Sequence, residues 1–310
     1  MNEFEKIERG AAAFQGNMLV NVSGGVGSCV AWQRCIEWYG ADRVTAVFCD
    51  TRTESEETYK FLEDVERQLG ALTVLWTNRD TWEISAGGLD SDRSNGADIR
   101  DVFFKHRMTK TPKGGCKASM ILKRLPLDKF FIAGDYQGQA VGFMPDEIDR
   151  VLRLNEAKEA CFAAAGGGEI IYPCICRPGI SRCDAITEVE SWGIRVPKSY
   201  KDGFDHNNCL RLGCILMGNE QWVGFLETHP DRYAEAEDWS EKFREETGFA
   251  MCKDRRGGVT KPLTLVQIRE EVASGERFEE TWRSTCGCMT QGKLFLSDYD
   301  NVVLKEIKKR

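Results

Sequence analysis

A glycine-rich turn between a short apolar run and an amphipathic segment constrains this chain more than any other feature. Residues 18–22 are apolar except for Asn21 and predict a short buried strand, and residues 29–39 carry apolar side chains at helical spacing. Glycines let a backbone approach a ligand closely, and the N–H groups at the start of a helix attract anions. The turn therefore predicts a cradle for phosphate, formed by Ser23, Gly24, Gly25, Val26, Gly27 and Ser28.

Two well-known phosphate-binding loops do not fit this turn. The P-loop ends in Gly-Lys followed by Ser or Thr, whereas no lysine occurs between residues 11 and 59. The dinucleotide-binding fingerprint requires a third glycine at the position that Val30 occupies here. A glycine turn that only joins a core strand to a helix is the alternative without a ligand.

Charge and hydropathy argue against several classes of protein. The formal net charge of −7 argues against a generally basic nucleic-acid surface, and no apolar run approaches the ~20 residues of a membrane-spanning helix. The first residues are acidic and lack the layout of a signal peptide, so we expect a cytoplasmic protein with no membrane partner. The 13 cysteines do not favour a disulfide framework, and we expect most to be buried as small apolar side chains, among them Cys29, Cys35, Cys49, Cys161 and Cys252.

Strand and helix signals alternate through the first half of the chain. A second strand is predicted at 44–49, a helix from about Thr53 to Leu69, and a third strand at 72–76. This alternation is typical of parallel βαβ units, in which ligands bind beyond the carboxyl ends of the strands. We interpret residues 85–117 as a loop or lid. The remaining predictions are a short helix at 118–125 that Pro126 ends, a strand at 130–134, a charged helix ending near Ala165, and a strand at 169–172.

The character of the chain changes near residue 172. Proline, cysteine, tryptophan and charge become dense beyond it, and helices are predicted at 215–226, 233–247 and 263–274. With 310 residues the chain is long enough for one or two domains. We therefore predict an α/β domain over 1–172 and a mostly helical or irregular region over 173–310.

Two close cysteine pairs lie in the second half. Cys209 and Cys214 form one pair, and Cys286 and Cys288 the other. Four thiolates suit either a structural zinc ion or a [4Fe–4S] cluster, and the sequence does not choose between them. Four unrelated cysteines in a cysteine-rich chain are the alternative.

The turn Ser-Gly-Gly-x-x-Ser directly after the first strand resembles the PP-loop of the ATP pyrophosphatase, or adenine nucleotide alpha hydrolase-like, superfamily. Within it, the chain resembles the phosphoadenosine phosphosulfate (PAPS) reductase-like family, especially its small members from phages and bacteria. The similar stretches follow the family's order through nearly the whole chain: 22–28, 48–51, 119–124, 142–150, 203–214, 226–233, 257–265 and 286–288. The resemblance implies a Rossmann-like parallel sheet with helices on both faces.

The resemblance also implies roles for individual residues. ATP or a related adenine nucleotide would be bound by Ser23, Gly24, Gly25, Gly27 and Ser28, with Asp50 and Thr51 on the adenosine side. The catalytic residues would be Lys123, Arg150 and His206. Glu147 would line the cleft beside Arg150, and Asn207 and Asn208 would join His206 in orienting substrate or cluster. The cluster ligands would be Cys209, Cys214, Cys286 and Cys288.

Three departures from the family pattern stand out. Many members carry Asp where this chain has Gly27. Relatives often have Cys at the position of Ala118, and Cys116 lies two residues away from that register. The Glu-Cys-Gly-Leu-His motif near the C-terminus of the reductases proper is absent.

The activity implied by the resemblance is adenylation of an acceptor, with release of pyrophosphate, in preparation for sulfur transfer. Mg²⁺ would accompany the nucleotide, and the acceptor would be a nucleic acid or a small molecule. A sulfur-donor protein or a second copy of the chain would be the protein partner. The alternatives are a sulfonucleotide (PAPS) reductase, in which a cysteine attacks sulfur, and a non-catalytic nucleotide-binding protein with a structural zinc.

Overall fold

The computed structural model describes residues 3–112, 114–204, 207 and 209–275. Its centre is a six-stranded sheet in the order β4-β3-β2-β1-β5-β6, in which only the β3–β4 pair is antiparallel. The strands are β1 Met18–Val22, β2 Val44–Cys49, β3 Leu72–Thr77, β4 Ile84–Gly87, β5 Gly138–Val141 and β6 Glu169–Ile171. The chain is thus an α/β protein with a mostly parallel sheet, compatible with the expected Rossmann-like fold.

The strand order places a switch point beside β1. The chain runs outward from β1 through β2 and β3, then crosses back to β5 on the other side of β1. Val20 at the centre of β1 pairs with Ala46 of β2 and Ala140 of β5. The crevice where the chain direction divides is where open α/β sheets bind ligands. Here it lies between the carboxyl ends of β1 and β5.

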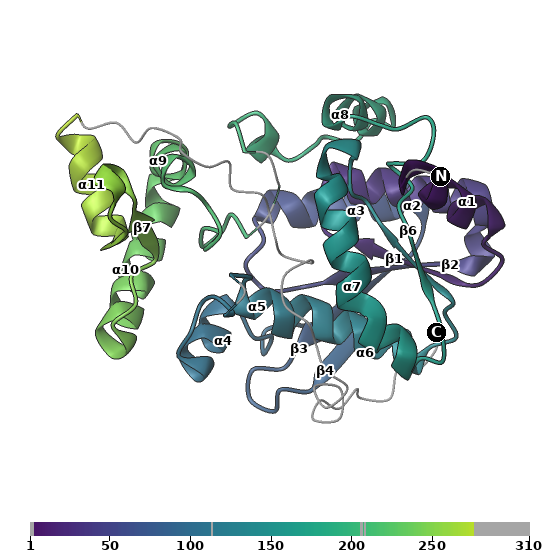
Figure 1. Ribbon diagram of the computed structural model, residues 1–310, viewed down its shortest axis with the longest axis horizontal. Coiled ribbons are helices and arrows are strands. Elements are labelled where there is room, and N and C mark those ends of the chain that lie inside the picture. The colour runs from purple at the N-terminus through teal and green to yellow at the C-terminus, as the bar shows by residue number, and fades with distance from the viewer. Residues whose placement is uncertain (1–2, 113, 205–206, 208, 276–310) are drawn as a thin grey trace.

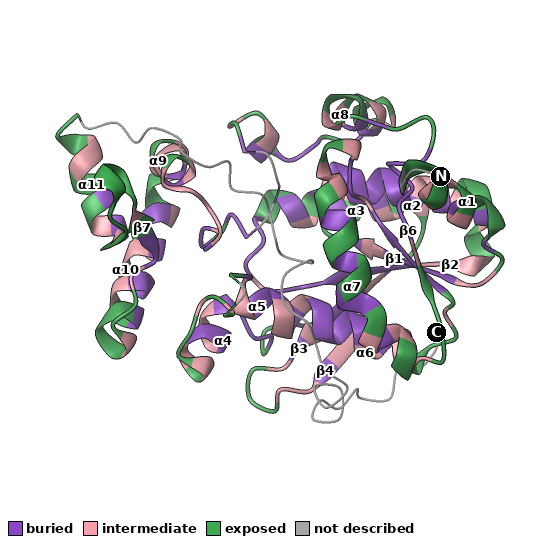
Figure 2. Ribbon diagram, in the orientation of Figure 1, coloured by how far each residue is buried: buried purple, intermediate pink, exposed green. Residues whose placement is uncertain are grey.

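Helices cover both faces of the sheet (Figure 1). Val20, Val22 and Phe48 face one apolar cluster, which includes side chains of α1 Glu3–Ala13, α2 Val26–Tyr39, α3 Glu56–Leu69 and α8 Arg182–Ser191. Leu19 and Val47 face the other, formed with α6 Leu125–Ala133 and α7 Ile148–Ala164. Figure 2 shows burial concentrated along the strands and the inner sides of these helices. The five cysteines expected in the core, Cys29, Cys35, Cys49, Cys161 and Cys252, are buried.

The strand predicted at 130–134 is wrong, because these residues lie in and just after α6. The helix that was expected to end at Pro126 instead continues through α5 Lys117–Ser119, a π-helical turn at Met120–Arg124, and α6. Pro126 follows directly after the π-helical turn, and its missing N–H does not end the helix. The true strand, β5, follows at Gly138–Val141, where Gln139 interrupts the apolar pattern.

The segment 85–117 is also more ordered than the predicted loop or lid. It contains the end of β4 and the helix α4 Ile99–His106, which begins with a capping box between Asp98 and Asp101. Ile99, Val102 and Phe103 point from α4 into a second apolar core. These few apolar residues are enough to hold α4 in place, because residues from the second half of the chain bury them.

This second core belongs to a helical group at one end of the molecule (Figure 1). Its elements are α9 Asn219–Thr228, α10 Pro230–Thr247 and α11 Leu265–Ala273, with a short hairpin of β7 Cys252–Asp254 and β8 Lys261–Leu263. The three helices confirm the helices predicted in this region. No helix in the described part of the chain is long and apolar enough to cross a membrane.

The two cores do not divide at a single point of the sequence. Ala118 and Leu122 pack into the helical core, whereas Cys174, Val189 and Val196 pack into the core beside the sheet. The boundary at 172 stays a prediction, and the chain crosses between the cores on both sides of it.

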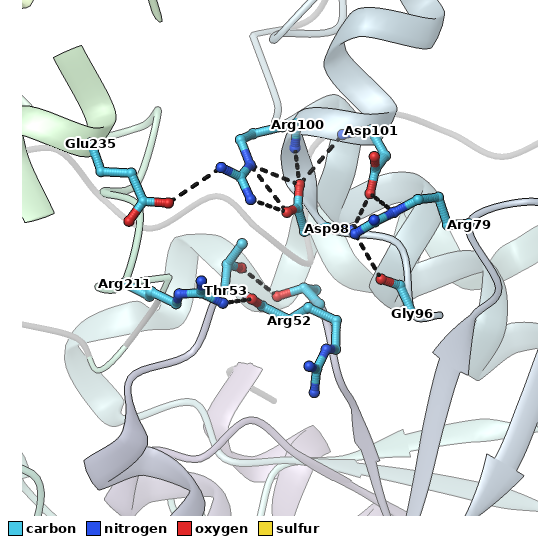
Figure 3. A network of polar contacts seen from close by, with 10 residues as sticks. Arg52, Thr53, Arg79, Gly96, Asp98, Arg100, Asp101, Arg211 and Glu235 are labelled. Atoms are coloured by element: carbon cyan, nitrogen blue, oxygen red, sulfur yellow. Dashed lines mark hydrogen bonds and ion pairs between the residues drawn. The ribbon is translucent and has the colours of Figure 1, made fainter. Parts of the chain in front are cut away.

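Polar contacts join the helical group to α4 and to the loop after β2 (Figure 3). Arg100 of α4 donates to Glu235 of α10 over 3.2 Å. The backbone N–H of Arg211 donates to the carbonyl oxygen of Thr53, also over 3.2 Å, and its guanidinium reaches the carbonyl oxygen of Arg52. The segment before α9 is thereby attached to the loop after β2.

Candidate functional site

A pocket opens at the carboxyl ends of β1, β2 and β5, in the crevice at the switch point. Its floor includes the predicted turn at Ser23, Gly25, Val26, Gly27 and Ser28. Lys123 comes from the π-helical turn, and Glu147 and Arg150 come from the start of α7. The remaining polar residues of the lining are Asn21, Arg182, Tyr200 and Asn207. The structure thus brings together most of the residues predicted to bind or act on a nucleotide.

The turn is held in shape by its own two serines. The N–H of Ser23 donates to Oγ of Ser28 over 3.0 Å, and that hydroxyl donates to the carbonyl oxygen of Gly25 over 2.8 Å. Gly24 has φ of 78°, a conformation that favours glycine. Gly25 is the N-cap of α2 and offers no side-chain cap. The positive dipole end of this 14-residue helix therefore lies at the pocket without a cap from its own N-cap residue.

Two residues far from the turn in sequence form hydrogen bonds with its backbone. The hydroxyl of Tyr200 accepts from the N–H of Val26 over 3.1 Å. Nδ2 of Asn207 donates to the carbonyl oxygen of Gly24 over 2.9 Å and to Oγ1 of Thr58 over 3.0 Å. The sequence assigned Asn207 to substrate or cluster and missed Tyr200 altogether. No local pattern marks either residue as a partner of the turn.

Gly27 is packed against the backbone of Gly142, just after β5. A Cβ atom on Gly27 would lie 2.6 Å from the carbonyl oxygen of Gly142 and 2.9 Å from the methyl group of Met144. Such distances are below ordinary contact, so a side chain here would force the start of α2 away from the segment that follows β5. In this structure, the space that an aspartate at position 27 requires is filled by protein.

Two basic side chains of the lining have different partners. Nζ of Lys123 donates to Oε1 of Glu54 over 3.0 Å, and both side chains are largely buried. Arg150 pairs with Glu147, and its guanidinium lies 4.1 Å from the ring centre of Phe143. Nε of Arg150 is buried and meets no hydrogen-bond partner among the described residues. Arg150 therefore keeps a donor for an anionic ligand in the pocket.

Asp50 and Thr51 do not line this pocket. The carboxylate of Asp50 is buried and accepts from Nε of Arg93 over 2.8 Å, from the hydroxyl of Tyr59 over 2.7 Å and from the N–H of Arg52 over 2.8 Å. Burial, followed by the charge of Asp50, raises the pKa of Tyr59 above its usual range. In this structure Asp50 anchors the loop that carries Arg93, and Thr51 faces a second cavity.

This second cavity is small, apolar and lined by three cysteines. Cys209 and Cys214 contribute as a pair, and Cys116 joins them from the start of α5. Thr51, Ile99, Ser119, Lys123 and Ile215 complete the lining. Burial raises the pKa of the Cys209 thiol to about 12, and the charge of Lys123 acts in the opposite direction. Cys116 lies two residues before the position at which the similar family often has a cysteine. The fold nevertheless places Cys116 in the same cavity as Cys209 and Cys214.

The cysteines of this cavity suit a metal that prefers thiolate ligands, but the described residues do not form a complete metal site. Among them, no group of three or more His, Cys, Asp or Glu side chains could hold a metal ion. The predicted ligands Cys286 and Cys288, together with His206 and Asn208, lie outside the described residues. The four-cysteine centre therefore stays a prediction.

Glu54 connects the two cavities. Its Oε1 accepts from Lys123, and its Oε2 accepts from the backbone N–H of Cys209 over 3.1 Å. Lys123 lines both the pocket at the turn and the cysteine cavity. Cys209 has φ of 44°, which is uncommon for a residue with a side chain. The loop conformation at Cys209 and the position of Lys123 therefore depend on the same buried carboxylate, which the sequence did not identify.

Comparison with known proteins adds no assignment. No protein family model matches the chain, and no curated protein is significantly similar to it. The resemblance to the PAPS reductase-like family stays a prediction, and the geometry of the two cavities carries the functional proposal.

Proposed function

We propose that this protein binds ATP or a related adenine nucleotide and activates an acceptor by adenylation, with release of pyrophosphate. The observation that carries the proposal is the position of the turn. Its glycine backbone and the N-terminus of α2 face a pocket at the switch point that also holds Lys123 and Arg150. Backbone donors, a helix dipole and two cationic side chains suit a chain of phosphates.

The reaction type comes from the resemblance, and the pocket supplies groups that suit it. An oxygen of the acceptor attacks the α-phosphorus, the bond to the bridging oxygen breaks, and pyrophosphate leaves with the electron pair. Negative charge grows on the leaving group, which the dipole of α2 and the guanidinium of Arg150 would stabilise. Mg²⁺, when bound, would neutralise phosphate charge, although Gly27 offers it no carboxylate.

Sulfur transfer is the proposed second half of the reaction. A sulfur nucleophile delivered by a donor protein would displace AMP from the adenylated acceptor. The support is the cysteine cavity, which shares Lys123 with the nucleotide pocket. Cys209 and Cys214, with Cys286 and Cys288, would hold a [4Fe–4S] cluster or zinc. When bound, a cluster would supply sulfide or electrons and zinc would join the two halves.

One observation favours the non-catalytic alternative. The aspartate common in PP-loops is replaced by Gly27, and Gly142 occupies the space it would need. A protein that binds the nucleotide without cleaving it would retain the turn and lose that carboxylate.

The double variant Ser23→Ala/Ser28→Ala tests the cradle. It removes the hydroxyls that shape the turn, so we expect ATP binding, measured by calorimetry, to weaken on the order of tenfold or more. Circular dichroism should show a folded protein. The matched control is Thr264→Ala, which also removes a hydroxyl that hydrogen-bonds to backbone, here at the start of α11 in the other core, and should leave ATP binding unchanged.

Unchanged ATP binding in the double variant would rule out the cradle. Product analysis then separates the two functions. AMP and pyrophosphate formed from ATP by the wild-type protein, and lost in Arg150→Met, support adenylation. Tight ATP binding with no cleavage in the presence of cell-extract acceptors supports the binding protein.

A further inference from the structure

The nucleotide pocket contains a buried amide without a partner. Nδ2 and Oδ1 of Asn21 are both buried, and neither makes a hydrogen bond to the described residues. Buried polar groups are nearly always paired in native proteins, because an unpaired one loses its hydrogen bonds to water without replacement. Asn21 also lines the pocket. Its unmet donor and acceptor therefore indicate a partner that enters the pocket from outside.

The surroundings of Asn21 show what kind of group fits there. In the parallel register, Asn21 pairs with Val47 of β2 and Val141 of β5, so the three side chains share one face of the sheet. Both valines line the pocket, as does Leu127 of α6. Aliphatic walls on either side of one amide suit a flat heterocycle with polar atoms on its edge better than a phosphate.

The position of Asn21 along β1 agrees with this. Asn21 precedes Ser23 by two residues, which is roughly 7 Å of extended strand. If the phosphates bind at the turn and the N-terminus of α2, the group that contacts Asn21 is a different part of the nucleotide. Asn21 is neutral and offers one donor and one acceptor, whereas Lys123 and Arg150 offer the charge that phosphates require.

We propose that Asn21 recognises the base of the bound nucleotide and selects adenine. Its Oδ1 accepts from the exocyclic amino group, and its Nδ2 donates to the adjacent ring nitrogen N7. Guanine and hypoxanthine present two acceptors at that edge, so only one of the two bonds can form. The inference rests on the proposed function and identifies the residue that sets its base specificity.

The experiment compares three ligands on the full chain: ATP, GTP and inorganic tripolyphosphate, which has no base. The variants are Asn21→Leu, which removes both hydrogen-bonding groups, and the near-isosteric Asn21→Asp, which replaces the donor with an acceptor. Gln139→Leu is the matched control, because Gln139 is also a buried amide without a partner among the described residues but does not line the pocket.

We expect the wild type to prefer ATP over GTP, and Asn21→Leu to weaken ATP binding on the order of tenfold or more while tripolyphosphate binding is unchanged. Asn21→Asp should behave likewise if Asn21→Leu does not fold. Gln139→Leu should change neither. Unchanged ATP binding in both Asn21 variants would overturn the role of Asn21 alone. A wild type that binds neither ATP nor tripolyphosphate would overturn the proposed function as well.

Discussion

The pocket at the glycine turn and the cysteine cavity share Lys123 but are built on different principles. The floor of the pocket is backbone, set by a strand, a turn and a helix that follow one another in the chain. The cysteine cavity is lined by side chains from segments far apart, with Cys116 on one side and Cys209 and Cys214 on the other. The turn that forms the floor of the pocket lies wholly within the described residues, whereas two of the predicted cysteine ligands lie outside them. A site with a floor of local backbone is therefore the easier of the two to predict from sequence.

The largest expected effect comes from breaking the ion pair between the cavities. Lys123→Met leaves the carboxylate of Glu54, which is 1% exposed, without its ammonium partner. Removing one member of a buried pair costs about 3–5 kcal/mol, and urea unfolding should show a loss of this size. Lys242→Ala is the control, because Lys242 pairs with Asp238 in solvent, where such pairs contribute about 0–1 kcal/mol.

The double variant Lys123→Met/Glu54→Gln sharpens this result. Because it removes both charges, it should recover part of the stability that Lys123→Met loses. The single variant Glu54→Gln completes the comparison. If the losses of unfolding free energy in the two single variants simply added in the double variant, the two side chains would act independently and would not join the cavities.

A smaller effect is expected at the contact between Gly27 and Gly142. Gly27→Ala places a Cβ 2.6 Å from a carbonyl oxygen, and overpacking of this kind costs about 1–3 kcal/mol in unfolding free energy. Gly27→Asp should be worse, although it introduces an aspartate that is common in the PP-loops that this turn resembles. The control is Gly224→Ala in α9, where a Cβ meets nothing within 4 Å and should stabilise the helix.

A stable Gly27→Asp variant would contradict the close approach of the two backbones. If this variant also cleaved ATP in a Mg²⁺-dependent reaction, the backbone around Gly27 would be able to move enough to accept a side chain.

The last effect is confined to solutions above about pH 9: a pH dependence of the metal-free protein that belongs to the cysteine cavity. Burial raises the pKa of the Cys209 thiol from 9.0 to about 12. Between these values the unfolded chain has lost a proton that the folded chain keeps, so stability falls as pH rises, by about 1.4 kcal/mol per pH unit for this thiol. Cys209→Ser should flatten the curve of unfolding free energy between about pH 9 and 11. Identical slopes for the two proteins would place the thiol in contact with solvent.

Prediction from sequence succeeded where structure depends on neighbours in the chain. The strand, turn and helix around Ser23–Ser28 follow from apolar spacing and glycine chemistry alone. It failed at 130–134, because Phe130 and Phe131 suit a buried helix as well as a buried strand, and only packing against the sheet and α7 decides. The strand β5 was not predicted, because Gln139 interrupts its apolar pattern.

The candidate site was predictable to the same extent. Ser28, Lys123 and Arg150 line one pocket; the glycine turn pointed to Ser28, and the family resemblance pointed to Lys123 and Arg150. Tyr200 and Glu54 act across the fold, and no local pattern could single them out. Asp50 was expected at the ligand, but its charge is matched by Arg93, and that pairing is a property of tertiary structure.

The crossing of the chain between its two cores has a consequence for synthesis on the ribosome. The core beside the sheet is closed by Val189 and Val196, and α4, made early, is covered only once α10 has emerged. The nascent chain must therefore hold Ile99, Val102 and Phe103 exposed while more than a hundred further residues are translated. During that interval α4 presents an apolar face that a chaperone could bind.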